Sequence, residues 1–183
     1  MLSTGKRVSA AAQLLANIGV IALCLLVGWL AVKKSGAWTG APDLSGRPPV
    51  YRTGDAIDAV AGVDFKAARR TLVMVVREDC RYCAESLPFY QKLTEARAKN
   101  PGQDLRVIVA TTDAHETLAA YLRSNRVDVD KVVTIAAGAL KVPGTPSLLL
   151  VDATGRILSF WRGKLPPQQE QEVLRVLGLT SSE

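Results

Sequence analysis

The sequence predicts an α/β fold, a mixed central sheet sandwiched by flanking helices, preceded by one N-terminal transmembrane helix. Three observations support this prediction. Short apolar runs alternate with helical patterns in residues 51–183, two later runs flank a turn, and residues 14–32 carry no charge. Runs that alternate with helices indicate strands joined by crossover helices, and two runs around a short turn indicate a hairpin.

The uncharged segment 14–32 reads LLANIGVIALCLLVGWLAV. Its length of about 19 residues is enough for a helix to cross a ~30 Å hydrocarbon core. Trp29 lies near one end, where an aromatic ring prefers the membrane interface. Basic residues bracket the segment on both sides: Lys6, Arg7, Lys33 and Lys34. A cleaved signal peptide is the alternative, but its apolar region is usually 7–15 residues long, so we expect an uncleaved anchor.

The chain of 183 residues therefore divides into four parts. We expect a short tail at 1–13, the transmembrane helix at 14–32, a Gly/Pro-rich linker at 33–50 and one globular domain at 51–183. The net charge of +6 belongs mainly to the membrane flanks, because the rest of the chain has 19 basic and 17 acidic residues. No basic patch for nucleic acid is predicted.

In the globular part, residues 71–77 and 105–110 are near-continuous apolar runs. Such runs are typical of strands covered on both faces, and we expect both to be central and parallel. Residues 80–100 show helical spacing and end at an Asn-Pro-Gly cluster. A second helix is predicted over 112–125, opened by a capping-box spacing from Asp113 to Glu116.

The C-terminal third has a different pattern. Residues 147–151 and 156–160 flank the turn-forming stretch 152–155, which predicts an antiparallel hairpin. Pro166 opens a last helix, and Gly178 is its expected stop. The expected buried stripe of that helix contains Val173, Leu174 and Leu177. Residues 55–68 give no assignable pattern.

Cys80 and Cys83 stand in the sequence Glu-Asp-Cys-Arg-Tyr-Cys, directly after a predicted strand and at the start of a predicted helix. Unpaired N–H groups and the macrodipole at a helix N-terminus favour the thiolate, which is the reactive form of cysteine. The pattern predicts a redox pair. The third cysteine, Cys24, lies inside the apolar segment and is interpreted as an apolar filler of the membrane helix.

The globular part resembles a thioredoxin fold, a βαβαββα core with an extra strand–helix unit between Cys83 and Pro146. Three spaced signals carry the resemblance: the strand followed by Cys80-Arg81-Tyr82-Cys83, then Pro88, then Val142-Pro143-Gly144-Thr145-Pro146 before the hairpin. With the predicted anchor, the chain is similar to membrane-tethered thioredoxin-like proteins of bacteria. Those proteins are single-pass inner-membrane proteins with the C-terminal domain on the periplasmic side.

The resemblance implies a thiol:disulfide oxidoreductase. Cys80 would attack a substrate disulfide, and Cys83 would resolve the mixed disulfide. Pro146 would be the cis-proline beside the pair, and the backbone of Thr145 would bind an extended substrate segment. The two residues between the cysteines would tune the redox potential: Arg81 and Tyr82. Pro88 would bend the active-site helix.

Two positions depart from the family pattern. Asp79 stands where many thioredoxins have tryptophan, and Met74 stands where a buried acid usually assists proton transfer. Glu85 is a candidate substitute acid, with a solvated surface carboxylate as its alternative interpretation. Acidic neighbours would raise the thiol pKa, whereas Arg81 and the helix end would lower it. The redox direction is therefore open from the residues, and only the resemblance favours a reductant.

The expected partners follow from this interpretation: protein thiol or disulfide clients, a membrane electron-donor redox protein, and the lipid bilayer through residues 14–32. No cofactor is expected beyond the redox-active disulfide, and no metal site. A structural zinc site would need four ligands, and the chain has one cysteine pair and His115 as its single histidine. The alternatives are a copper(I) carrier that uses the two thiolates, or a non-redox assembly or binding protein.

Overall fold

The computed structural model of the chain describes residues 50–180 and residues 17, 18, 20, 24 and 26. The predicted tail, most of the predicted transmembrane helix and the predicted linker lie outside the described residues. Among the residues that are described, we find no helix long and apolar enough to cross a bilayer. The chain separates into two compact units, 1–47 and 48–183. The second unit contains the cysteine pair and the residues that form the hydrophobic core.

A five-stranded mixed sheet forms the centre of this unit, in the order β3-β2-β1-β4-β5. The β1 strand pairs in parallel with β2 and antiparallel with β4, β2 pairs in parallel with β3, and β4 and β5 form an antiparallel hairpin. The central parallel pair and the hairpin were predicted, whereas β3 was not. The strands are β1 (Arg70–Val75), β2 (Leu105–Thr111), β3 (Lys131–Thr134), β4 (Ser147–Asp152) and β5 (Ile157–Arg162).

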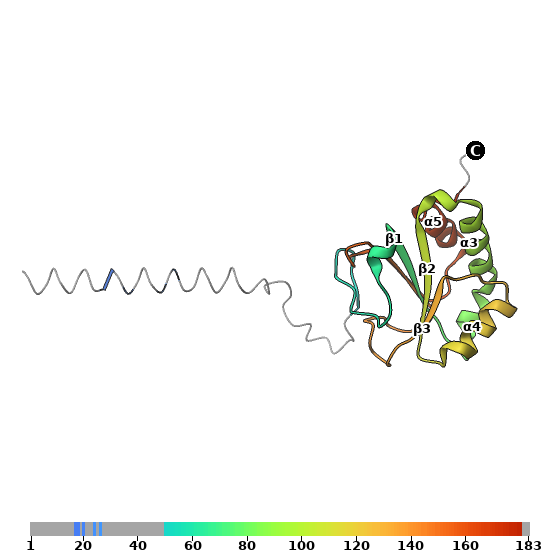
Figure 1. Cartoon of the computed structure of the whole chain (residues 1–183), viewed down its shortest axis with the longest axis horizontal. Helices are drawn as coiled ribbons and strands as arrows, with labels where there is room; N and C mark the ends of the chain where they lie inside the picture. The colour runs from blue at the N-terminus through green and yellow to red at the C-terminus, as the bar shows by residue number, and fades with distance from the viewer. Residues whose placement is uncertain (1–16, 19, 21–23, 25, 27–49, 181–183) are drawn as a thin grey trace, which may run out of the picture. The chain divides into compact units, whose positions relative to one another are not determined.

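One face of the sheet is covered by helices, which lie to the right of the strands in Figure 1. Leu72 and Met74 of β1 point into this face and share one buried cluster with Leu93, Leu118 and Val173 from three different helices. All five side chains are fully buried. The helices are α2 (Arg81–Glu85), α3 (Leu87–Lys99), α4 (His115–Ser124) and α5 (Pro167–Val176).

The opposite face is covered by irregular chain, so the prediction of a sheet sandwiched by helices is wrong. Val73 and Val75 of β1 pack there against side chains from residues 51–65 and 135–142, drawn at the left of the sheet in Figure 1. In the described part of these segments, the helical structure is one short 3-10 turn, η1 (Phe65–Ala67). Both parallel crossovers run in the same direction along the sheet, and right-handed crossovers then place α3 and α4 on one face.

The predicted helix 80–100 is divided at Ser86. Its N–H donates to the carbonyls of Tyr82 and Cys83, which closes α2, and its own carbonyl accepts from the N–H of Tyr90 in the next helix. Pro88 lies in the first turn of α3 and has no N–H to continue the α2 ladder. The active-site helix is therefore interrupted next to Pro88, and the bend itself stays a prediction.

The two predicted helix ends have different outcomes. The capping box of the second helix is wrong, because α4 follows Ala114 without a side-chain cap. The Asp113 carboxylate instead accepts the N–H of Glu78, at 2.8 Å, in the loop before the cysteines. The stop at Gly178 is confirmed: its φ is +69°, and the N–H of Leu179 donates to the Leu174 carbonyl at 2.8 Å, closing a Schellman motif.

Candidate active site

The cysteine pair lies where the chain leaves β1 and enters α2. Cys80 is the N-cap of α2, and a disulfide joins it to Cys83 with the two Cα atoms 5.1 Å apart. The Cys80 sulfur is half-buried and accepts the N–H of Cys83 at 3.1 Å, whereas Cys83 is buried within the helical-face cluster. An N–H directed at the outer sulfur stabilises a negative charge there, so the geometry favours Cys80 as the thiolate.

The predicted substrate-binding residues lie beside this sulfur. The peptide bond between Thr145 and Pro146 is cis, as expected. The carbonyl oxygen of Thr145 is 3.5 Å from the Cys80 sulfur, although the two residues are 65 positions apart in the chain. Among the backbone bonds between described residues, Thr145 has no partner. Its N–H and carbonyl are therefore available to an extended peptide.

The two residues between the cysteines point outward. The Arg81 guanidinium is paired with the Glu85 carboxylate, with Nε 2.8 Å from Oε1. Lys164, from the loop after β5, reaches the other oxygen of Glu85 at 2.9 Å. Tyr82 is 57% exposed and is accessible to a partner protein. The structure thus places both predicted tuning residues at the site, with the charge of Arg81 already paired.

Glu85 does not have the character of a general acid. The hydrogen bond from Lys164, followed by that from Arg81, lowers the pKa of the Glu85 carboxyl below its usual value. The carboxylate is therefore ionised at neutral pH and accepts hydrogen bonds. The alternative interpretation, a surface carboxylate, describes Glu85 better than the role of substitute acid.

The negative charge of the acidic residues near Cys80 is also partly compensated by a neighbouring arginine. The Arg77 guanidinium lies 2.7 Å from the Asp79 carboxylate and 3.6 Å from that of Asp113. On the buried side, Met74 is fully buried in the same apolar cluster as Cys83. The position where the resemblance expects a buried acid thus holds an apolar side chain.

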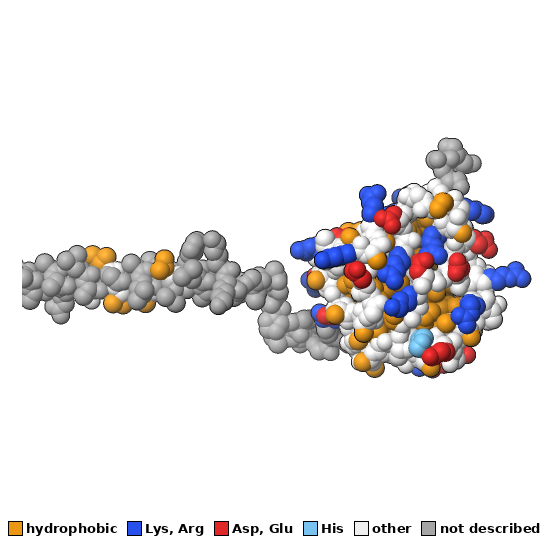
Figure 2. Space-filling model, in the orientation of Figure 1, with side chains coloured by type: hydrophobic (Ala, Val, Ile, Leu, Met, Phe, Trp, Pro, Cys, Tyr) orange, Lys and Arg blue, Asp and Glu red, His pale blue; other side chains and the backbone are white. Residues whose placement is uncertain are grey.

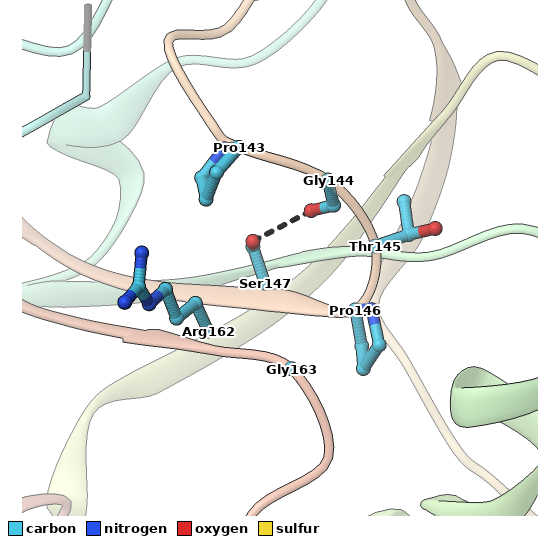
Figure 3. Close-up of a pocket in the computed structure, with 7 residues that line it drawn as sticks. All are labelled: Pro143, Gly144, Thr145, Pro146, Ser147, Arg162 and Gly163. Atoms are coloured by element: carbon cyan, nitrogen blue, oxygen red, sulfur yellow. Dashed lines mark hydrogen bonds between the residues drawn. The ribbon is translucent and has the colours of Figure 1, made fainter. Parts of the chain in front are cut away.

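A pocket of about 320 Å³ lies behind the cis-proline loop. Figure 3 shows Thr145 and Pro146 at one side of it and Arg162, at the end of β5, at the other. The lining residues are Pro143, Gly144, Thr145, Pro146, Ser147, Arg162 and Gly163. The last two were missed by the sequence reasoning. Extending the predicted hairpin by two residues would have found Arg162, because it is the cross-strand partner of Ser147, and Gly163 is the next residue.

Metal ligands are not gathered at this site. Among the described residues, no group of three or more His, Cys, Asp or Glu side chains could hold an ion. His115 is at the start of α4, where its side chain is 56% exposed and 3.2 Å from the Glu116 carboxylate; it is the pale-blue side chain in Figure 2. The two sulfurs would thus be the whole donor set of a metal carrier.

A family model of the thioredoxin-like domain matches residues 64–177, which is more than half of the chain. The chain belongs to the thioredoxin-like family. The matched span includes the cysteine pair, the cis-proline loop and the hairpin, so the thioredoxin-like family and the thioredoxin-like α/β fold with a mixed sheet are confirmed. No curated protein sequence matches the chain.

Solved structures agree with this thioredoxin-like fold. The thioredoxin domain of a thiol-disulfide oxidoreductase from Bacteroides vulgatus superposes with a TM-score of 0.53 at 16% identity, over 69% of this chain and 97% of that one. A thioredoxin-family thiol:disulfide interchange protein from Chlorobium tepidum TLS gives 0.52 at 12% identity, over 70% and 97%. At these identities the likeness shows the fold, and both names match the enzyme class predicted from the sequence.

Proposed function

We propose that this protein is a membrane-tethered thiol:disulfide oxidoreductase that reduces disulfides in exported proteins. One observation carries the proposal. The half-exposed sulfur of Cys80 lies between the N–H of Cys83 and the carbonyl of Thr145, beside the cis peptide bond, while its partner sulfur is buried. A reactive outer sulfur, a shielded resolving sulfur and an open backbone edge are the parts that thiol exchange requires.

The reaction proceeds in two exchanges. The Cys80 thiolate attacks one sulfur of the client disulfide, the client S–S bond breaks, and the released client sulfur takes a proton. Cys83 then loses its proton and attacks Cys80 in the mixed disulfide, which releases the second client thiol. Two electrons pass from the cysteine pair to the client, and the pair becomes the disulfide that the structure contains. A dithiol electron donor must then reduce it again.

The tether and the location rest on the sequence. The uncharged segment 14–32 supports an anchor in the bilayer. The resemblance to tethered bacterial thioredoxin-like proteins supports the periplasmic side of the inner membrane, a membrane-bound electron donor and reduction as the direction. We propose the Cys80–Cys83 disulfide as the only redox group. Protease protection of the domain in intact spheroplasts tests its location, and the reduction potential of the pair tests its direction.

The catalytic proposal is tested with the full-length chain and a dye-labelled protein disulfide. With dithiothreitol as electron source, the wild type should accelerate reduction, and Cys80→Ser should lower the rate to the background. Cys24→Ser is the matched control and should keep the wild-type rate. Cys83→Ser should accumulate mixed disulfides with clients. Activity that survives in Cys80→Ser, or stoichiometric sub-nanomolar copper(I) binding without any exchange, would reject the proposal.

A further inference from the structure

We infer that the pocket behind the cis-proline loop is a specificity pocket for a client carboxylate, and that Arg162 is the residue that recognises it. This inference rests on the proposed function and names its substrate class: disulfide-bonded segments with Asp or Glu at a fixed position near the reacting cysteine. The pocket shares Thr145 and Pro146 with the site that faces the Cys80 sulfur. A peptide lying along Thr145 would therefore lie beside residues that also line the pocket.

The lining leaves one side chain free for recognition. The Ser147 hydroxyl is occupied, because it donates to the Gly144 carbonyl at 2.7 Å. The carbonyl of Pro146 accepts the N–H of Gly163 at 2.7 Å, and neither proline has an N–H to offer. Arg162 is the one lining residue with an ionised side chain. Figure 3 shows it on the same side of the pocket as the Pro143 ring, while the Thr145 side chain points the other way.

No acidic side chain of the described residues neutralises the charge of Arg162. Among the described residues it forms no ion pair and no side-chain hydrogen bond, and no Asp or Glu lines the pocket. The neighbouring Lys164 differs, because Glu85 holds its ammonium group at 2.9 Å. An unpaired guanidinium in a concave site offers a planar fork of donors, the geometry that fits a carboxylate.

The size of the pocket also indicates a side chain as its occupant. A volume of about 320 Å³ is near the lower end of the range of small-ligand sites. Residues in an extended peptide alternate in direction, so one residue near the client cysteine faces the pocket while its neighbours do not. Recognition should consequently depend on the position of the acidic residue, which separates it from a general attraction between opposite charges.

The test uses synthetic disulfide-bonded peptides with glutamine at the three positions on each side of the cysteine. Glutamate is placed at one position at a time, and kcat/KM for reduction is measured with the full-length protein. We expect one or two positions to raise kcat/KM by about threefold to fivefold over the glutamine peptide, the contribution of a partly exposed ion pair. Arg162→Gln should remove this preference, and Arg162→Glu should transfer it to a lysine peptide of the same register.

Lys92→Glu is the control for charge, because it makes the same change of net charge as Arg162→Glu at an exposed position on α3. It should keep the glutamate preference. A preference that is equal at all positions, or that Arg162→Gln leaves intact, overturns the inference. The glutamine peptide separates the two claims, because its reduction supports the proposed function even where no glutamate preference is found.

A binding measurement decides the inference if no exchange occurs. The Cys80→Ser/Cys83→Ser variant is mixed with a linear peptide that carries serine in place of cysteine and glutamate at each position in turn. We expect NMR shift changes at Arg162 and Gly163 for the best position. Their absence at every position overturns the inference.

Discussion

Leu149 and Leu150 are neighbours in β4, yet they enter two different environments. Leu150 packs in the cluster under the helices, whereas Leu149 packs under the irregular segments on the other face. Both are almost completely buried. The helical face provides the cysteine pair through α2. The irregular face continues through residues 135–142 into the loop that carries the cis-proline, so the candidate active site lies where two differently built layers meet.

The two faces of the sheet are equally buried, but the segments that cover them are held in place in different ways. On the helical face, each covering element has its own backbone hydrogen bonds and can hold its shape when a core side chain is removed. On the other face, the cover depends on a few fixed points, of which Tyr51 is the first. Its hydroxyl donates to the Asp58 carboxylate at 2.6 Å, and its N–H donates to the Lys141 carbonyl at 3.2 Å.

The largest expected effect comes from truncating the two leucines. Leu150→Ala should lower the free energy of unfolding by about 4 kcal/mol, and Leu149→Ala by about 3 kcal/mol, because irregular chain can relax into a cavity better than a rigid helix can. Urea denaturation of both variants measures the difference. Equal losses, or a larger loss for Leu149→Ala, would show that the irregular cover is as rigid as the helices.

A smaller effect on the free energy of unfolding is expected at Tyr51, which holds the irregular cover in place. Tyr51→Phe should lower the free energy of unfolding at pH 7 by about 2 kcal/mol, because it removes two hydrogen bonds: the one that the hydroxyl donates to the Asp58 carboxylate and the one that it accepts from the Asp58 N–H. Burial, and then the bond to Asp58, raise the pKa of Tyr51 from 10.0 to about 12. The bond from Tyr51 is in turn the main reason why the pKa of Asp58 is lowered from 3.8.

The signs of these shifts give the pH dependence. A raised folded pKa gives stability that is complete below pH 10.0 and is lost as the pH rises towards about 12. A lowered folded pKa at Asp58 gives stability that is present above pH 3.8 and is lost as the pH falls through the folded value. The advantage of wild type over Tyr51→Phe should therefore shrink at both extremes, and an advantage independent of pH would contradict this account of the fixed point.

The smallest expected effect concerns the helical side of the site, where charges are paired. Glu85→Gln would release Arg81 and Lys164, leaving more positive charge near Cys80 and stabilising its thiolate. The reduction potential should become less negative by a shift on the order of 10 mV, since these charges are exposed. Equilibration with glutathione measures it. The double variant Glu85→Gln/Arg81→Gln should have a reduction potential close to that of the wild type. An unchanged potential in Glu85→Gln alone would mean that Arg81 does not act on the sulfur.

The helical face was predictable because its apolar residues recur at the regular spacing of a strand or a helix. The apolar runs that became β1 and β2, and the stripe of the last helix, each follow one backbone geometry over several residues. The short strand β3 was missed because its four residues include only two valines, too few to establish alternation. Residues 55–68 gave no prediction because irregular chain buries Val60, and partly buries Val63, without any repeat.

The candidate site was predictable where its residues lie in recognisable local sequences. Cys80, Cys83 and the Thr145-Pro146 pair have such contexts, and the structure brings them together. Asp113 was misassigned because its alternative partner, the N–H of Glu78, is 35 residues away. Arg162 has no motif of its own, and its importance arises only from the register of the hairpin.

Tyr51 also determines where mechanical load would enter the domain. Tension along the preceding chain would act first on Tyr51, whose backbone is held by a single hydrogen bond to Lys141, five residues before the cis-proline. The central sheet would be loaded later, because its strands are held by continuous ladders. Tyr51 therefore couples the start of the domain directly to the segment that leads into the cis-proline loop.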